Sequence, residues 1–434
     1  MRTIPHIRTS STFRALRHRN YKLWFFGQGV SLVGSWMQTM AQQVLVYRLT
    51  GTATSLGMIN FISLLPLVPL TLIGGSITDR FSKRTILLFT QVILMLQALL
   101  LALLTYTGTV QVWHVYVLSL ILGMVNAIDI PARQAFTVDM VEGKEDLTNA
   151  IGLNSAMFNG ARALGPAMAG LAVAATGEST AFLINGVTFL AVIASLLAMR
   201  GLPVVMPAKV QVQMSQHIWE GLKFIGSRRE LFYLVGLIGV SAFLSMPYST
   251  LMPVFAQDVL GASAQPVIDY VCFSGPLPMH CQAPEALPLG ALLTTVGIGA
   301  LIGALVVASL PDNARRGTML TLGNLAFPAL LLAFALSRSF LLSMLLLMLI
   351  GISFVWQNAL ANTLLQLLSP DALRGRVLGV YSMVFQASMR LGGLQAGLMA
   401  DWISAPFSVA IGAVISLFFG LFVAVREPKI REMV

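Results

Sequence analysis

Three ionisable side chains stand inside or near long apolar runs of this chain, where they could act on a ligand. Arg162 and Arg390 each lie about 14 residues into a run, close to the middle of a membrane at a rise of about 1.5 Å per residue. A guanidinium at that depth is costly, stays charged, and by default marks a ligand pathway. The alternative is structural, with each arginine bound to helix ends or carbonyl groups. If both face a cavity, that cavity favours anionic or zwitterionic ligands.

Asp129 is the third such residue and lies near the end of another apolar run. A carboxyl group that changes its access can carry a proton, which makes Asp129 the candidate for proton coupling. Arg133 follows four residues later, one helical turn away, so a local ion pair is the competing interpretation.

A charged turn lies between the second and third apolar runs. It contains Gly75, Asp79, Arg80, Lys83 and Arg84. The pattern predicts a tight connection between two membrane helices, with the acid acting as a latch at a helix N-terminus. A solvated turn would explain the basic residues but not the acid between them.

The elements that must position these residues are membrane helices. The chain has 434 residues, of which 56% are hydrophobic and only 10% are charged, whereas an average soluble protein has about a quarter charged residues. A span needs about 20 mainly apolar residues and must be helical, because the bilayer offers no water to unpaired backbone groups. We predict twelve spans, at about 22–46, 53–78, 85–107, 112–134, 149–175, 180–200, 231–257, 288–310, 317–337, 340–363, 376–400 and 405–425.

Charge placement predicts the orientation. With both termini in the cytoplasm, only Arg48 and Arg338 face outward among the 27 Lys and Arg residues, apart from the two arginines within spans. Basic residues collect on the cytoplasmic side of membrane proteins. Their placement also argues for contact with anionic lipid and against nucleic acid. Cys272 and Cys281, the only two cysteines, fall in the longest outward loop, where a disulfide fits an oxidising exterior. Free cysteines are the alternative.

The chain contains an internal repeat. At one constant offset, Gly152 matches Gly379, Gly165 matches Gly392 and Gly170 matches Gly397. Spans five and eleven are therefore equivalents in two halves of six spans, an arrangement that places a substrate site near mid-membrane at their interface. The predicted organisation is a basic tail (1–21), an N-terminal half (22–200), a cytoplasmic linker (201–229), a C-terminal half (230–425) with an outward loop (258–288), and a short cytoplasmic tail (426–434).

The charged turn and this architecture resemble the major facilitator superfamily of transporters, although Ser82 replaces the second glycine of the family's turn motif. Gly165, Pro166 and Gly170 are similar to the antiporter signature of the family's exporters. With the start Phe13-Arg14-Ala-Leu-Arg17 and the end of span four, the chain resembles the twelve-span bacterial exporters that include macrolide efflux pumps and the enterobactin exporter. The mid-span-four arginine of many proton-driven drug exporters is absent from 118–125.

The resemblance implies a monomeric transporter in the bacterial inner membrane. It implies export of a hydrophobic or amphiphilic small molecule by alternating access, with protons as the coupling ion. The alternative within this class is a dedicated exporter of one endogenous anionic metabolite, such as a siderophore. It also implies that spans one, four, seven and ten line a central cavity. Polar residues share a face in these spans, namely Gln38, Gln42, Asn126, Ser245, Asn358 and Asn362. Such polar stripes also bind helix to helix.

Other functional classes have little support. No carboxylate pair or His/Cys cluster lies within a span, which argues against an enzyme or a metal site. The sequence also lacks the glycine-rich phosphate-binding loop that would indicate ATP use. We therefore expect no cofactor. A receptor role would lack a substantial soluble domain.

Overall fold

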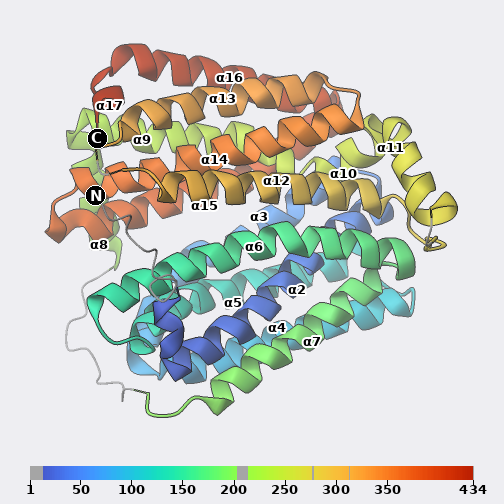
Figure 1. Cartoon of the computed structure of the whole chain (residues 1–434), viewed down its shortest axis with the longest axis horizontal. Coiled ribbons are helices and arrows are strands. Elements are labelled where there is room, and N and C mark those ends of the chain that lie inside the picture. Colours follow the sequence, from blue (N-terminus) through green and yellow to red (C-terminus); the bar gives the residue numbers. More distant parts are fainter. Residues whose placement is uncertain (1–12, 203–213, 276–277, 312, 434) are drawn as a thin grey trace, which may run out of the picture.

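The structure is a computed structural model. It describes the backbone of residues 13–202, 214–275, 278–311 and 313–433, and within these ranges the side chains at 68, 71–80, 144 and 214–217 are outside the description. The described chain forms twelve long helical segments that run side by side, with both termini at one end (Figure 1). The predicted all-α, twelve-helix fold is confirmed.

The twelve segments are, in order, α2 (Arg19–Thr50), α3 (Ala53–Arg80), α4 (Lys83–Tyr106), α5 (Val112–Asp139), α6 (Lys144–Thr176), α7 (Glu178–Ala198), a seventh segment from α9 (Arg229–Val240) through α10 (Met252–Val254) to Val259, α12 (Ala286–Ala308), α13 (Arg316–Leu336), α14 (Phe340–Leu368), α15 (Asp371–Trp402) and α16 (Ala405–Arg426). Shorter elements are η1 (Arg14–Arg17), α8 (Met214–Ser227), α11 (Gly261–Asp269) and α17 (Lys429–Glu432). The predicted linker thus contains α8, and the predicted outward loop contains α11.

Eight of the long segments in the described part of the chain are apolar enough to cross a membrane by length and composition alone. Of the other four, α3 is apolar over its described part, Ala53–Leu67, and the remaining three are α2, α6 and α15. Three of the four, α3, α6 and α15, carry the contacts between the two halves of the molecule, and α2 and α6 line a cavity. Their polar and small residues therefore face protein or cavity rather than lipid, which is where a bilayer protein tolerates them.

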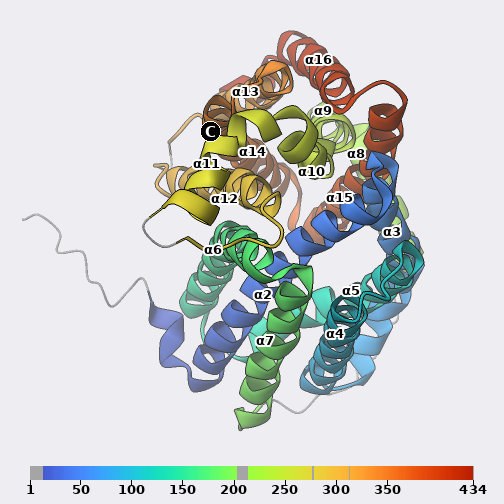
Figure 2. The same cartoon turned by 90° about the vertical axis from the view of Figure 1, so that its right-hand side faces the viewer.

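The two halves meet along two seams. We call α2–α7 the N-half and the segments from α9 to α16 the C-half. Helix α6 packs against α12, and α3 packs against α15, as the end-on view shows (Figure 2). Gly170 lies directly against Gly290 in the first seam, and Gly397 lies against Ala53 in the second. The absence of side chains lets these backbones approach closely.

The internal repeat is visible in these contacts. Gly165 packs against α2 at Trp36, and its repeat partner Gly392 packs against the seventh segment at Phe243. Because α2 and the seventh segment are the first helices of their halves, matched glycines make matched contacts. The fold therefore has the twofold pseudo-symmetry that the sequence repeat predicts.

The bundle is closed at the end opposite the termini. Tyr47 in the N-half donates a hydrogen bond to Asp258 in the C-half at 2.5 Å. Among the described residues, all hydrogen bonds between the halves lie at this opposite end or near mid-bundle. At the termini end, by contrast, Gly152 and its repeat partner Gly379 face open space.

Two repeat-equivalent positions close the opposite end. The carboxylate of Asp401, at the end of α15, accepts hydrogen bonds from the backbone N–H groups of Ala53 and Thr54 at 2.7 and 2.8 Å. The offset of the repeat pairs Asp401 with Ala174, at the end of α6. The carbonyl oxygen of Ala174 accepts from two backbone N–H groups of the C-half, those of 282 and 283, at 2.7 and 3.1 Å. In both contacts the C-half satisfies unpaired helix-end groups of the N-half.

A disulfide-bonded cap carries the second of these contacts. Cys272 and Cys281 are bonded to each other, and Cys272 packs in a small apolar cluster with Ile268, Leu287 and Ala174. Helix α11 lies across the ends of the long helices at this point (Figure 1). The cap therefore ties the C-half to the end of α6.

Candidate functional site

The N-half contains a cavity of about 820 Å³. Its walls come from α2, α4, α5, α6 and α7, all in the N-half. Its polar wall consists of Gln28, Ser31, Ser35, Gln38, Thr39, Gln42, Gln91, Gln97, Asn126, Arg133, Gln134, Thr137, Asn154, Ser155, Asn159 and Asn185. Its apolar wall includes Trp24, Phe158 and Phe189. The size is in the range of ligand sites, which span about 300–1,000 Å³.

Gln38 and Gln42 line this cavity, but they also bind neighbouring helices. Gln38 donates to Gln97 at 3.0 Å and accepts from Asn185 at 2.6 Å. Gln42 donates to Ser119 at 3.0 Å. Both amides are buried, so part of the predicted polar stripe of α2 holds the N-half together. Asn126, from α5, also lines the cavity and makes no hydrogen bond with another described residue.

The predicted residues of the C-half do not line the cavity. Ser245 is buried in the irregular seventh segment, where its hydroxyl has no partner among the described residues. Asn358 donates to the carbonyl oxygen of Phe354 in its own helix, and Asn362 accepts from Gln366. The described lining of this cavity therefore comes from the N-half alone, and the predicted contribution of spans seven and ten is not found there.

Asp129 and Arg133 form one buried group. One oxygen of Asp129 accepts hydrogen bonds from Thr90 Oγ1 at 2.7 Å and from Gln91 Nε2 at 2.8 Å. The other oxygen accepts from the guanidinium of Arg133. The Asp129 side chain is fully buried, whereas that of Arg133 is 27% exposed and lines the cavity. Arg133 is the only ionisable side chain among the described residues that line this cavity.

Arg162 lies where the two halves meet. Its guanidinium is 5.9 Å from the ring centroid of Trp36 in the N-half and 5.3 Å from that of Phe354 in the C-half. The Trp36 ring in turn packs on the cavity-lining Phe158, with centroids 5.7 Å apart. Arg162 makes no ion pair with another described residue. Two aromatic faces give it about 0.5–2 kcal/mol each, which does not replace a counter-ion.

Arg390 makes a structural contact across the second seam. Its guanidinium donates to the carbonyl oxygen of Ser63 in α3 at 3.1 Å. It is partly buried and has no carboxylate partner among the described residues. Of the two mid-membrane arginines, Arg390 fits the structural alternative better than Arg162 does.

The charged turn is only partly described. Gly75, Asp79 and Arg80 lie in α3, where the side chains are outside the described residues. Lys83 forms an ion pair with Asp139 at 2.8 Å, and Arg84 donates to the carbonyl oxygen of Leu197 at 3.0 Å. These two basic residues bind within the N-half. Their role as part of a gate remains a prediction.

The antiporter-like residues lie at the interface of the halves. Gly165 packs against α2, Gly170 packs against α12, and Pro166 is accommodated within a continuous α6. Their small size permits both contacts of α6. The link between these residues and export stays a prediction.

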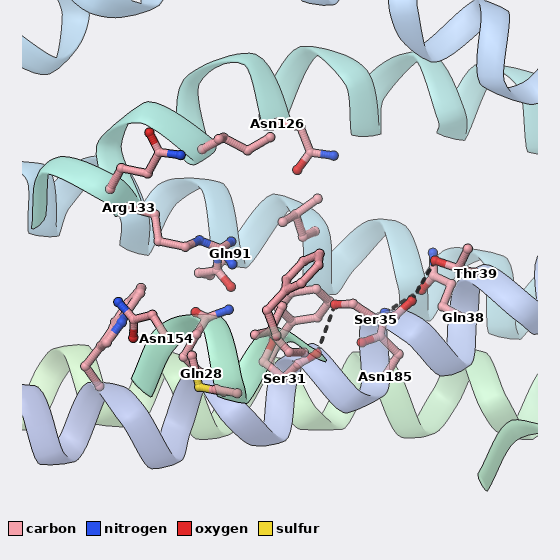
Figure 3. A pocket seen from close by; sticks show the side chains of 18 of the residues that line it. Gln28, Ser31, Ser35, Gln38, Thr39, Gln91, Asn126, Arg133, Asn154 and Asn185 are labelled. Carbon is pink, nitrogen blue, oxygen red and sulfur yellow. Dashed lines mark hydrogen bonds between the residues drawn. The ribbon is translucent and has the colours of Figure 1, made fainter. Parts of the chain in front are cut away.

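Several cavity residues were not singled out as cavity residues from the sequence, among them Gln28, Gln91 and Arg133. Gln28 and Gln91 are 2% and 1% exposed, and each has a side-chain oxygen with no hydrogen-bond partner among the described residues. Figure 3 shows Arg133 extending toward Gln91, with Gln28 on the facing wall. The spacing of four residues predicted that Arg133 pairs with Asp129, and the structure contains this pair. Only the fold shows that the Arg133 side chain also lines the cavity.

A second charged cluster fixes the N-terminal segment to α6. Asp146, in the first turn of α6, lies 2.5–2.7 Å from side-chain nitrogens of Arg14, Arg17 and His18. The hydrogen bond from His18 and the charges of the two arginines hold the pKa of Asp146 below its usual range. The cluster thus joins η1 to the termini end of the N-half.

We expect Asp146→Asn to release η1 at neutral pH, because the neutral amide cannot balance three basic side chains. The folded-state pKa is lowered, so the carboxylate stabilises docking at every pH above its ordinary value and loses this effect only as the pH falls through the lowered value. Hydrogen exchange of residues 14–17 at neutral pH, corrected for intrinsic rates, should be faster in Asp146→Asn than in the wild type. Equal protection in Asp146→Asn would contradict this role.

Comparison with known proteins agrees with this fold. A family model described as transmembrane secretion effector matches residues 10–270 and 276–433. A staphyloferrin A transporter of Staphylococcus aureus is 25% identical over 389 residues, which cover 88% of this chain and 89% of the relative. The multidrug efflux pump Tap of Mycolicibacterium fortuitum is 25% identical over 416 residues, covering 94% and 93%. A crystal structure of a POT family transporter in complex with 5-aminolevulinic acid has a TM-score of 0.71 at 11% identity, covering 95% and 96% of the two chains.

Proposed function

The chain belongs to the transmembrane secretion effector family of major facilitator exporters, and we propose that it exports amphiphilic organic anions in exchange for protons. The observation that carries the proposal is the identity of Arg133 as the only ionisable residue lining the described cavity. A guanidinium in a partly dehydrated wall attracts a carboxylate or similar anion far more strongly than it would in water.

The surrounding charges support an anionic cargo. Asp129 is already engaged by Arg133, Thr90 and Gln91. Neither Arg162 nor Arg390 has a carboxylate partner in the described part of the chain. The middle of the molecule therefore carries excess positive charge, and an anionic cargo offsets the cost of burying it.

The uncharged wall residues indicate which chemical groups a suitable cargo has besides its anionic group. Amide and hydroxyl groups alternate with Trp24, Phe158 and Phe189 on the walls. Amides offer both donors and acceptors, and aromatic rings offer apolar surface. A cargo with an anionic group, further polar groups and an apolar body fits this wall.

The orientation follows from the positive-inside rule, which places the termini end in the cytoplasm. In our proposal, the cavity receives cargo from the cytoplasm and Asp129 carries the exchanged proton. Asp129 takes up this proton from the outside once the cargo has left. Loss of the proton to the cytoplasm restores the site.

This cycle uses the membrane potential twice. A proton entering and a monovalent anion leaving both move charge in the direction favoured by an inside-negative potential. Each charge contributes about 2.3 kcal/mol per 100 mV. Export of an anion therefore needs no further source of energy.

A second candidate is general efflux of uncharged drugs. It is favoured by the amide-rich and aromatic wall, which can hold neutral compounds, and by the name of the multidrug efflux relative. In that case Arg133 would position helices α4 and α5 through Asp129 and would not select cargo.

Binding to the purified protein separates the two candidates. Three ligands share one body and differ in charge: 3-phenylpropionate, 3-phenylpropionamide and 3-phenylpropylamine. We expect calorimetry to show the anion binding about tenfold or more tightly than the neutral amide, and the cation binding most weakly. Arg133→Gln should remove the preference. Arg374→Gln is the matched control, since Arg374 pairs with exposed Asp371 outside the cavity. Tightest binding of the cation, or a preference unchanged in Arg133→Gln, would refute the anion proposal.

A further inference from the structure

We propose that Gln28, Gln91 and Arg133 form a subsite for an anionic head group that carries a hydroxyl or amide N–H beside the charge. This inference rests on the proposed function and names the chemistry of the cargo's head group. It goes beyond charge selection, because the two glutamines offer acceptors that a simple carboxylate cannot satisfy.

The orientation of Gln91 is fixed by its partner. Its Nε2 donates to Asp129 at 2.8 Å, so its Oε1 must be the free end of the amide. That oxygen is buried and has no hydrogen-bond partner among the described residues, although the side chain lines the cavity. A buried acceptor without a donor costs free energy until a ligand or water supplies one.

Gln28 presents a second acceptor from the facing helix α2. Its side chain is 2% exposed and lines the same cavity, and its Oε1 also lacks a partner in the described structure. In Figure 3, Gln28 and Gln91 approach the same space from different helices. Two acceptors on opposite walls predict a donor group of the ligand between them.

Arg133 supplies the charged donors of the subsite. One terminal nitrogen is engaged by Asp129, which fixes the plane of the guanidinium. Its Nε is buried without a partner among the described residues, and the side chain is 27% exposed and lines the cavity. The remaining N–H groups can therefore pair with an anion that lies next to the two acceptors.

Together these groups distinguish ligands of equal charge. A carboxylate alone pairs with Arg133. It offers no donor to the side-chain oxygens of Gln28 and Gln91, because its own oxygens are also acceptors. A hydroxyl or amide N–H on the adjacent carbon donates to one of them. An ammonium group would also donate, but the neighbouring guanidinium repels it. Sites built to bind a hydroxyl discriminate strongly against analogues that lack it.

The test compares 3-phenyllactate with 3-phenylpropionate, which differ only in a hydroxyl beside the carboxylate. Calorimetry on the wild type should show about tenfold tighter binding of 3-phenyllactate. Gln28→Met, which keeps the length of the side chain and removes its acceptor, should lower the ratio while 3-phenylpropionate binds as before, and Gln28→Met/Gln91→Met should bring the ratio close to one. Gln43→Met is the matched control, because Gln43 also has an unpartnered buried oxygen but does not line the cavity. It should keep the preference.

The outcomes separate this inference from the proposed function. Equal binding of the two acids that still depends on Arg133 overturns the subsite and leaves the anion proposal standing. A preference that is unchanged in Gln28→Met/Gln91→Met also overturns the subsite. Failure of both acids to bind at millimolar concentration, with binding of 3-phenylpropionamide, overturns both.

Discussion

Arg133→Met should reduce transport of an anionic amphiphile about a hundredfold while a neutral analogue is transported at a similar rate. The guanidinium makes charge-assisted hydrogen bonds in a partly dehydrated wall, and such bonds contribute about 1.5–3 kcal/mol each. Every 1.4 kcal/mol corresponds to a tenfold change. The measurement is protein-dependent flux of 3-phenyllactate and its methyl ester in proteoliposomes.

The single variant also removes the partner of a buried carboxylate. An unpaired Asp129 would cost about 3–5 kcal/mol and could unfold the N-half. The double variant Asp129→Asn/Arg133→Met removes both charges and should recover thermal stability without recovering anion transport. Recovery of anion transport in the double variant would show that Arg133 acts only by neutralising Asp129.

Asp401→Ala should shift the molecule toward the state that is open at the end opposite the termini. The carboxylate of Asp401 caps the first residues of α3 across the second seam, with bonds of 2.7 and 2.8 Å from two backbone N–H groups. Loss of both charge-assisted bonds would cost the closed end about 3 kcal/mol, or about a hundredfold in population. Spin labels at exposed positions 107 and 338 report the distance between the halves at this end.

Asp371→Ala is the matched control for this prediction. Asp371 is an acid at the other end of the same helix, 90% exposed, and it pairs only with Arg374 on its own helix. It should leave the label distances unchanged. Identical distance distributions in Asp401→Ala and the wild type would show that the seam is held by glycine packing alone.

The spans and the repeat could be predicted from the sequence because each has a strong local signal. A bilayer requires long apolar helices, and matched glycines mark equivalent seams in both halves. The closure at Asp401 and Ala174 has no such signal, since one partner is a side chain and the other a backbone carbonyl. Only the folded chain shows that repeat-equivalent positions perform the same task.

The cavity was harder to predict. Gln38 and Gln42 share a face with Ser31 and Ser35, but an amide on a helix face has the same pattern whether it meets a cavity or a neighbouring helix. Each of these two amides lines the cavity and also binds a neighbouring helix. The cavity role of Arg133 could not be predicted for a related reason. Its pairing with Asp129 at a spacing of four residues is enough to explain why an arginine stands at this position. Its second face depends on how α4 and α5 pack.

The most direct test of the proposed anion export is electrogenic flux in proteoliposomes that contain only this protein. With the termini side facing outward, uptake of 3-phenyllactate should be accelerated by an acidic interior and by a positive interior potential, and each stimulus should act alone. Asp129→Asn should keep exchange of internal for external anion but lose the response to the pH gradient. Uptake of the methyl ester that exceeds uptake of the anion, or anion uptake indifferent to the potential, would contradict anion export by proton exchange.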